Sequence, residues 1–136
     1  MKRPSFLKKK EILFSAKTPR EDLIIWGDRF LEEMRLHDAL AFYRQAGHLE
    51  GVARIRETAI QKGDFFLFRE AQDGLDPGNA AREELGLLAK NAEAAGRWHD
   101  ARKAFEQLRD PKGIRRAQEG LQALMGAAVG QEAGGG

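Results

Sequence analysis

The sequence predicts an all-α fold built from antiparallel helix hairpins that stack side by side. A five-residue phrase first indicates this, because Arg35–Ala39 returns as Arg97–Ala101 at an offset of 62 positions, with like residues aligned on both sides of it. Apolar residues also recur at helical spacing through most of the chain, and no segment shows a convincing strand pattern. Finally, the expected helices are joined by short connections, which places successive helices antiparallel.

The first hairpin is expected to begin at the Thr18-Pro19 pair. Thr18 is a suitable N-cap, and Pro19 suits the first helical position because its ring fixes φ at a helical value. Apolar residues at helical spacing over 23–34 predict the first helix. A second helix follows over 39–46, and Gly47 ends it.

The middle hairpin is expected over residues 52–71 and is shorter than its neighbours. Its turn is Gly63-Asp64, with Asp64 as the N-cap of the following helix. That helix opens with four large apolar residues, and a helix cannot bury all four against one neighbour. We expect Phe65 and Phe68 in the core. For Phe66 or Leu67, an exposed contact and a position sandwiched in the stack both remain open.

The third hairpin follows the strongest break in the body, residues 73–79. We expect one helix from Asn79 to Ala95, closed by Gly96, and another over 98–108. Asp110-Pro111 then opens a terminal capping helix over 111–125, which should stop at Gly126.

Three segments follow from this pass along the chain. Residues 1–19 form a basic N-terminal arm, residues 20–125 form the helical repeat domain, and residues 126–136 form a Gly/Ala-rich tail that we expect to be disordered. Residues 5–15 of the arm either form a short helix docked on the body or belong to a solvated terminus. In the domain, the large aromatic side chains should dominate the core. They are Trp26, Phe30, Tyr43, Trp98 and Phe105.

Composition fits one soluble domain. The chain has 136 residues, 42% of them hydrophobic and 32% charged. It contains no cysteine, which excludes disulfides and thiolate metal sites and agrees with a reducing compartment. No apolar run approaches the roughly 18 residues of a membrane span. We therefore expect a cytoplasmic protein.

Charge is divided unevenly along the chain. Residues 1–20 hold seven basic side chains against Glu11 alone, a net of +6, whereas the remaining 116 residues carry a net of −4. A basic arm thus precedes a mildly acidic body.

The residues of the repeated unit resemble the tetratricopeptide (TPR) pattern. That pattern places a large apolar residue, Leu-Gly and Tyr on one helix and Ala and Phe on the next. The matching positions are Leu23, Trp26, Gly27, Phe30, Ala39 and Tyr43 in the first copy, and Leu85, Leu88, Ala89, Ala92, Ala101 and Phe105 in the later one. Glycines 51 and 113 stand where the pattern has a proline. The middle unit fits poorly, since two full repeats would give an offset of about 68. The resemblance implies a solenoid of about three TPR-like units.

Residues that suggest chemistry have simpler structural explanations. His37 and His99 occupy the same position of the two copies, but neither has a His or Cys three or four residues away to share a metal. Asp38 and Asp100 each start a helix, where a carboxylate complements the helix dipole. No nucleophile elbow, phosphate-binding loop or dinucleotide fingerprint is present. We expect no enzyme activity and no cofactor or metal.

The TPR resemblance implies a concave groove, lined by the first helix of each hairpin, that holds a peptide or helix of a partner protein. Residues off the core stripe of those helices are the candidates: Ile24, Asp28, Leu31, Glu57, Ile60, Glu83 and Lys90. Ile24, Leu31 and Ile60 have no expected core role and would supply apolar contacts. The carboxylates favour a basic or mixed-charge ligand.

A second class of function remains open, in which the basic arm binds nucleic acid or an anionic surface through counterion release. The arm also raises a third possibility. In this hypothesis the arm packs across the acidic groove, of its own chain or of a neighbouring one, and competes with the partner.

Overall fold

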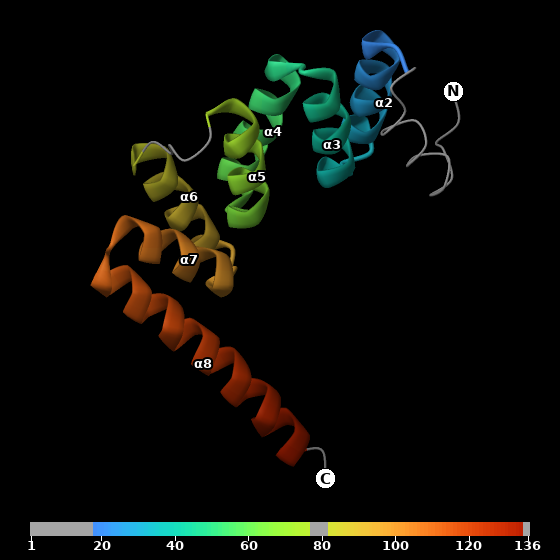
Figure 1. Ribbon diagram of the computed structural model, residues 1–136. Helices are drawn as coiled ribbons and strands as arrows, with labels where there is room; N and C mark the ends of the chain where they lie inside the picture. Colours follow the sequence, from blue (N-terminus) through green and yellow to red (C-terminus); the bar gives the residue numbers. More distant parts are fainter. Residues whose placement is uncertain (1–17, 77–81, 135–136) are drawn as a thin grey trace. The chain divides into compact units, whose positions relative to one another are not determined.

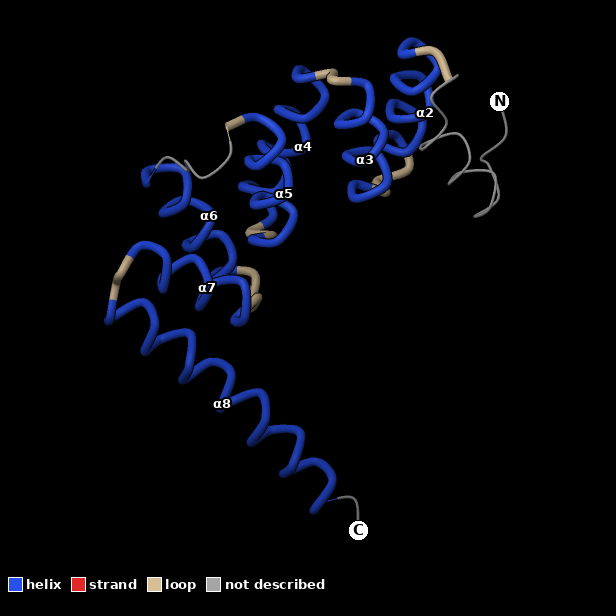
Figure 2. Tube along the Cα trace, in the orientation of Figure 1, coloured by secondary structure: helices blue, strands red, loops and turns tan. Residues whose placement is uncertain are grey.

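The computed structural model describes residues 18–76 and 82–134, which form α-helices joined by short loops, and no strand occurs among them (Figures 1 and 2). The all-α prediction is confirmed. The helices, in chain order, are α2 (Arg20–Glu32), α3 (Leu36–Ala46), α4 (Leu49–Lys62), α5 (Phe65–Leu75), α6 (Arg82–Ala94), α7 (Trp98–Leu108) and α8 (Pro111–Gly134).

The chain divides into two compact units. Unit 1 comprises Met1–Glu57 and Arg69–Asn79, and unit 2 comprises Thr58–Phe68 and Ala80–Gly136. The division therefore crosses α4 after Glu57 and α5 after Phe68. Each unit has a core of its own.

In unit 1 the core lies where α2 packs on α3. The Phe30 and Phe42 rings stack at 5.4 Å between centroids, and both side chains are buried. Tyr43 is also buried, between two glycines: a Cβ added at Gly27 would lie 2.6 Å from its ring, and one at Gly51 would lie 2.7 Å from it. The absence of a side chain at these two positions lets the helices approach closely.

In unit 2 the core lies where α7 packs on α6 and on α8. Phe105 is buried, and a Cβ added at Gly113 of α8 would overlap its ring. Gly120 stands in the same relation to Trp98. Gly51 and Gly113, which are 62 positions apart like the repeated phrase, therefore both contact the aromatic residue of the preceding helix.

The predicted helix ends are largely confirmed. Gly47, Gly63 and Gly96 have φ values of 65°, 70° and 71°, the left-handed conformation in which glycine ends a helix without strain. The side chain of Asp64 accepts a hydrogen bond from the Leu67 backbone N–H at 3.1 Å, so it is the predicted N-cap of α5.

Two helix ends differ from the prediction. Pro19 is the N-cap of α2 and not its first helical residue, because its ψ of 145° is extended while its carbonyl accepts from Asp22 N–H at 3.1 Å. Gly126 does not stop the last helix, since α8 continues to Gly134. A glycine ends a helix when it turns left-handed, and the alanine-rich sequence around Gly126 favours the helix instead.

The aromatic core is smaller than predicted. Phe30, Tyr43 and Phe105 are buried, whereas Trp26 and Trp98 are only partly buried. Met34, predicted as a helical core position, lies beyond the end of α2 with a φ of 59° and an exposed side chain. The arm over residues 1–17 and the proposed cap at Asn79 lie outside the described residues.

Candidate functional site

The N-terminal helix α2 presents the first three predicted partner-binding residues on one face. Ile24, Asp28 and Leu31 follow one another at helical spacing beside the buried stripe that Leu23 and Phe30 belong to. All three side chains are half-buried. This face can contact a ligand only with the outer parts of these side chains.

Asp28 has a structural role as well. The Tyr43 hydroxyl donates a hydrogen bond to Asp28 Oδ1 at 2.5 Å, which joins α3 to α2. Burial and then this hydrogen bond raise the pKa of Tyr43 above its usual range, since both disfavour the phenolate. One carboxylate oxygen of Asp28 is therefore already engaged inside unit 1.

The outward face of α2 carries a residue that sequence reasoning missed. Ile25 is 47% exposed. With Asp28, Arg29 and Glu32 it lines a shallow depression of about 330 Å³. Ile25 lies opposite the core stripe, and an isoleucine at such a position is the signal that the sequence offered. An apolar side chain ringed by both signs of charge suits a mixed-charge peptide.

The remaining predicted residues lie on α4 and α6. Glu57 of unit 1 is exposed, as are Glu83 and Lys90 of unit 2. Ile60 is not an exposed contact: it is 2% exposed, so its assignment as an apolar residue without a core role was wrong. Near its C-terminal end α4 buries both Ala59 and Ile60, a wider apolar stripe than the spacing of its core residues suggested.

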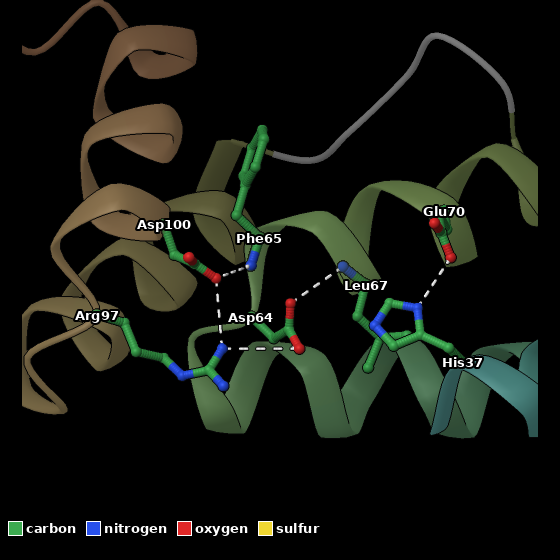
Figure 3. A network of polar contacts seen from close by, with 7 residues as sticks. All are labelled: His37, Asp64, Phe65, Leu67, Glu70, Arg97 and Asp100. Atoms are coloured by element: carbon green, nitrogen blue, oxygen red, sulfur yellow. Dashed lines mark hydrogen bonds and ion pairs between the residues drawn. The ribbon is translucent and has the colours of Figure 1, made fainter. Parts of the chain in front are cut away.

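The repeated phrase forms the same ion pair in both copies. Arg35 lies 2.7 Å from Asp38 in unit 1, and Arg97 lies 3.3 Å from Asp100 in unit 2. Asp100 does more than complement its own helix, because it accepts a hydrogen bond from the Phe65 backbone N–H at 3.0 Å (Figure 3). It thereby supplies a partner for the first residue of α5.

Arg97 extends this cluster. Its guanidinium also lies 3.6 Å from Asp64, the N-cap of α5, so one arginine contacts carboxylates on both sides of the same helix start (Figure 3). No sequence signal indicated this arrangement, since residues 64 and 97 are distant in the chain. The cluster holds unit 2 together, which supports the structural explanation of Asp100.

The three histidines have separate environments. In unit 1, His37 Nδ1 lies 3.3 Å from Glu70 Oε2 on the surface (Figure 3). The His48 ring packs on Tyr43 at 5.3 Å between centroids. His99 lies beside α8 in unit 2. Within residues 18–76 and 82–134, no group of three or more His, Cys, Asp or Glu side chains is arranged to hold a metal ion.

At the start of α5, the structure decides whether Phe66 or Leu67 is an exposed contact or a core residue. Phe65, Leu67 and Phe68 are buried, and Phe66 is exposed. Other exposed large apolar side chains were not predicted as contacts: Ile25, Met34, Leu49, Leu87, Leu124 and Met125. Leu124 and Met125 belong to the part of α8 that follows its buried residues.

No family model matches this chain, and no curated protein or solved structure is detectably similar to it. Among the helices that the structure describes, none has the length and apolar character to cross a membrane.

Proposed function

We propose that this chain is a non-catalytic protein-interaction adaptor that binds a peptide or helix of a partner. The observation that carries the proposal is the surface of α2, where Ile24, Ile25 and Leu31 offer apolar contact beside a mixed-charge depression. Apolar side chains exposed beside charged ones are typical of the core and rim of a protein interface.

The proposal includes a TPR-like arrangement of the hairpins. Its support is the use of small residues where helices meet: Gly27 faces Tyr43 of the next helix, and Ala89 and Ala101 are fully buried in unit 2. In a TPR-like array the first helix of each hairpin offers the ligand-binding face, and α2 would have that role in unit 1 and α6 in unit 2.

The charges of these helices suggest a ligand with basic or mixed character. Glu57 and Glu83 are exposed carboxylates on α4 and α6, and Glu32 lies at the depression on α2. Rim charges of this kind steer association and select partners more than they add affinity.

Affinity capture followed by quantitative mass spectrometry tests the proposal. The full chain serves as bait beside Ile24→Asp and Ile25→Asp variants, and Leu49→Asp is the control because Leu49 is an exposed apolar residue away from α2, at the start of α4. We expect a partner that both α2 variants lose by about tenfold or more and that the control retains, since a buried charge opposes apolar contact.

Salt separates this function from anion binding by the arm. A partner held by the α2 surface should persist when ionic strength rises, whereas arm-driven binding to nucleic acid should weaken steeply. If the Ile24→Asp and Ile25→Asp variants retain every partner, and those partners dissociate when the salt concentration is raised, the adaptor proposal is contradicted and binding by the arm is favoured.

A further inference from the structure

The last helix of unit 2, α8, is longer than α7, the helix on which it packs. Phe105, near the end of α7, contacts Gly113, and Trp98, at its start, contacts Gly120, so α7 and α8 run antiparallel. α7 has 11 residues and α8 has 24. Beyond Gly120, α8 therefore extends past the start of α7.

The apolar stripe of α8 continues into this extension. Gly113 and Ala117 are buried against α7, and Leu121 on the same stripe is half-buried. Leu124 is then 56% exposed and Met125 is 69% exposed. These two side chains continue the face of α8 that packs on α7, and they are exposed because α8 extends past the start of α7.

A groove lies along this stripe between α7 and α8, with a volume of about 570 Å³. Its lining residues are His99, Arg102, Gln118, Leu121, Gln122, Leu124 and Met125. The apolar members come from α8, and α7 contributes a guanidinium and an imidazole. No carboxylate is among the lining residues.

Among the residues that the structure describes, Arg102 forms a long ion pair. Its Nε lies 3.5 Å from Glu106 Oε1, whereas the Arg116–Glu93 pair of the same unit is 2.8 Å apart. Ion pairs of this kind, partly exposed on one helix face, contribute little to stability. A carboxylate brought into the groove has a cation to meet.

We propose that the α7–α8 groove docks an amphipathic helix of a partner protein, with Asp or Glu flanking its apolar face. Leu121, Leu124 and Met125 receive the apolar residues of that helix, and Arg102 pairs with its carboxylate. An amphipathic helix usually enters such a groove with apolar residues at positions i, i+3 and i+4 on one face.

Charge argues against the other two occupants. A second copy of this groove offers no carboxylate among its lining residues to meet Arg102. The N-terminal segment of residues 1–20 carries a net of +6, so it is repelled by the same guanidinium. The groove lies in unit 2 and is separate from the α2 surface, so this proposal goes beyond the adaptor function.

Two synthetic peptides of about 18 residues test the proposal with the full chain. Each places leucines at helical spacing on one face; one has glutamates flanking that face and the other has lysines. We expect the glutamate peptide to bind, in fluorescence anisotropy, about tenfold or more tightly than the lysine peptide. Hydrogen exchange should locate its protection on α7 and on residues 118–125 of α8.

Variants of exposed residues keep the test independent of folding. Leu124→Asp should weaken the glutamate peptide by about tenfold or more, and Arg102→Gln should reduce the preference for glutamate over lysine. Leu49→Asp, in unit 1, is the control and should change neither. Circular dichroism confirms that each variant remains helical.

The peptide experiments overturn the proposal if the glutamate peptide does not bind at millimolar concentration, if the two peptides bind with equal affinity, or if Leu124→Asp leaves binding unchanged. Self-association of the chain that Leu124→Asp abolishes also overturns it, because the occupant is then a second copy. The Ile25→Asp variant separates this surface from the α2 surface, since it should leave peptide binding intact.

Discussion

Tyr43 shows how a single residue joins two helices of unit 1. Its ring fills the space left by Gly27 and Gly51, and its hydroxyl donates to Asp28. The ring is buried completely, so the hydroxyl depends on this one carboxylate contact to avoid the cost of an unsatisfied buried donor. Tyr43 therefore supplies both a buried ring and a titratable hydroxyl to the core of unit 1.

Because the folded-state pKa of Tyr43 is raised, the stability it contributes depends on pH. The unfolded chain releases the phenol proton near pH 10, and the folded chain holds it to higher pH. The contribution is fully present below about pH 10 and declines as pH rises through the folded-state pKa. Tyr43 is the single tyrosine of the sequence, so tyrosinate absorbance follows it directly.

We expect Tyr43→Phe to lower the free energy of unfolding by about 1–2 kcal/mol at pH 7, because a hydrogen bond to a carboxylate is lost. Denaturant unfolding at pH 7 and above pH 10 measures the change, and the gap between variant and wild type should narrow at high pH. A gap that stays constant across this range would contradict the raised pKa of Tyr43 in the folded state, and no gap at pH 7 would show that the hydroxyl adds nothing to the packing of the ring.

At the scale of the element, glycines have two different roles in the helices of unit 2. Gly113 of α8 lies against the Phe105 ring, where an added Cβ would overlap it. Gly86 of α6 has no neighbour within 4 Å of an added Cβ. Both are helical, so they share the entropic cost of glycine and differ in the space around them.

We expect substitution of these two glycines by alanine to have opposite effects on the stability of unit 2. Gly113→Ala should destabilise unit 2 by about 1–3 kcal/mol, since the Phe105 ring must move. Gly86→Ala should stabilise it by about 0.4–1 kcal/mol, because alanine restricts the unfolded chain. Thermal unfolding of both variants measures the two changes. Equal effects of the two substitutions would mean that the close approach of α7 and α8 does not constrain the helix pair.

At the scale of the whole molecule, the main asymmetry is electrostatic. The first 20 residues carry a net of +6 and the remaining 116 carry −4, so the arm and the body attract each other. A basic arm over an acidic ligand surface would compete with a basic or mixed-charge partner. Such competition acts through mass action and needs no change of fold.

Removal of residues 1–17 should therefore raise the affinity for a partner captured by the α2 surface, or change the oligomeric state. This deletion retains Pro19, whose carbonyl begins α2. Surface plasmon resonance and sedimentation measure the two outcomes at low salt. If both stay unchanged, and hydrogen exchange finds the arm fully open in the intact protein, the arm has no such role.

Over the described residues, the sequence by itself determined the order of the helices, because apolar spacing, glycine stops and aspartate caps are local signals. The repeat also drew attention to Gly27, Gly51 and Gly113, although only the structure showed which aromatic ring lies against each. The sequence misjudged Ile60 and Gly126, since burial depends on neighbouring helices and a glycine stop depends on the conformation adopted there. Of the candidate site, Ile24, Asp28 and Leu31 were found on one face of α2, whereas Ile25 was missed.

Only the tertiary structure decided which groups meet across the chain. Asp100 reaches the start of α5, Asp28 receives the Tyr43 hydroxyl, and Arg102 shares a groove with Leu124 and Met125. These pairs are separated in sequence by intervals that no local pattern encodes. Their physical basis is the packing of helices, which sets distances between residues that helical periodicity cannot relate.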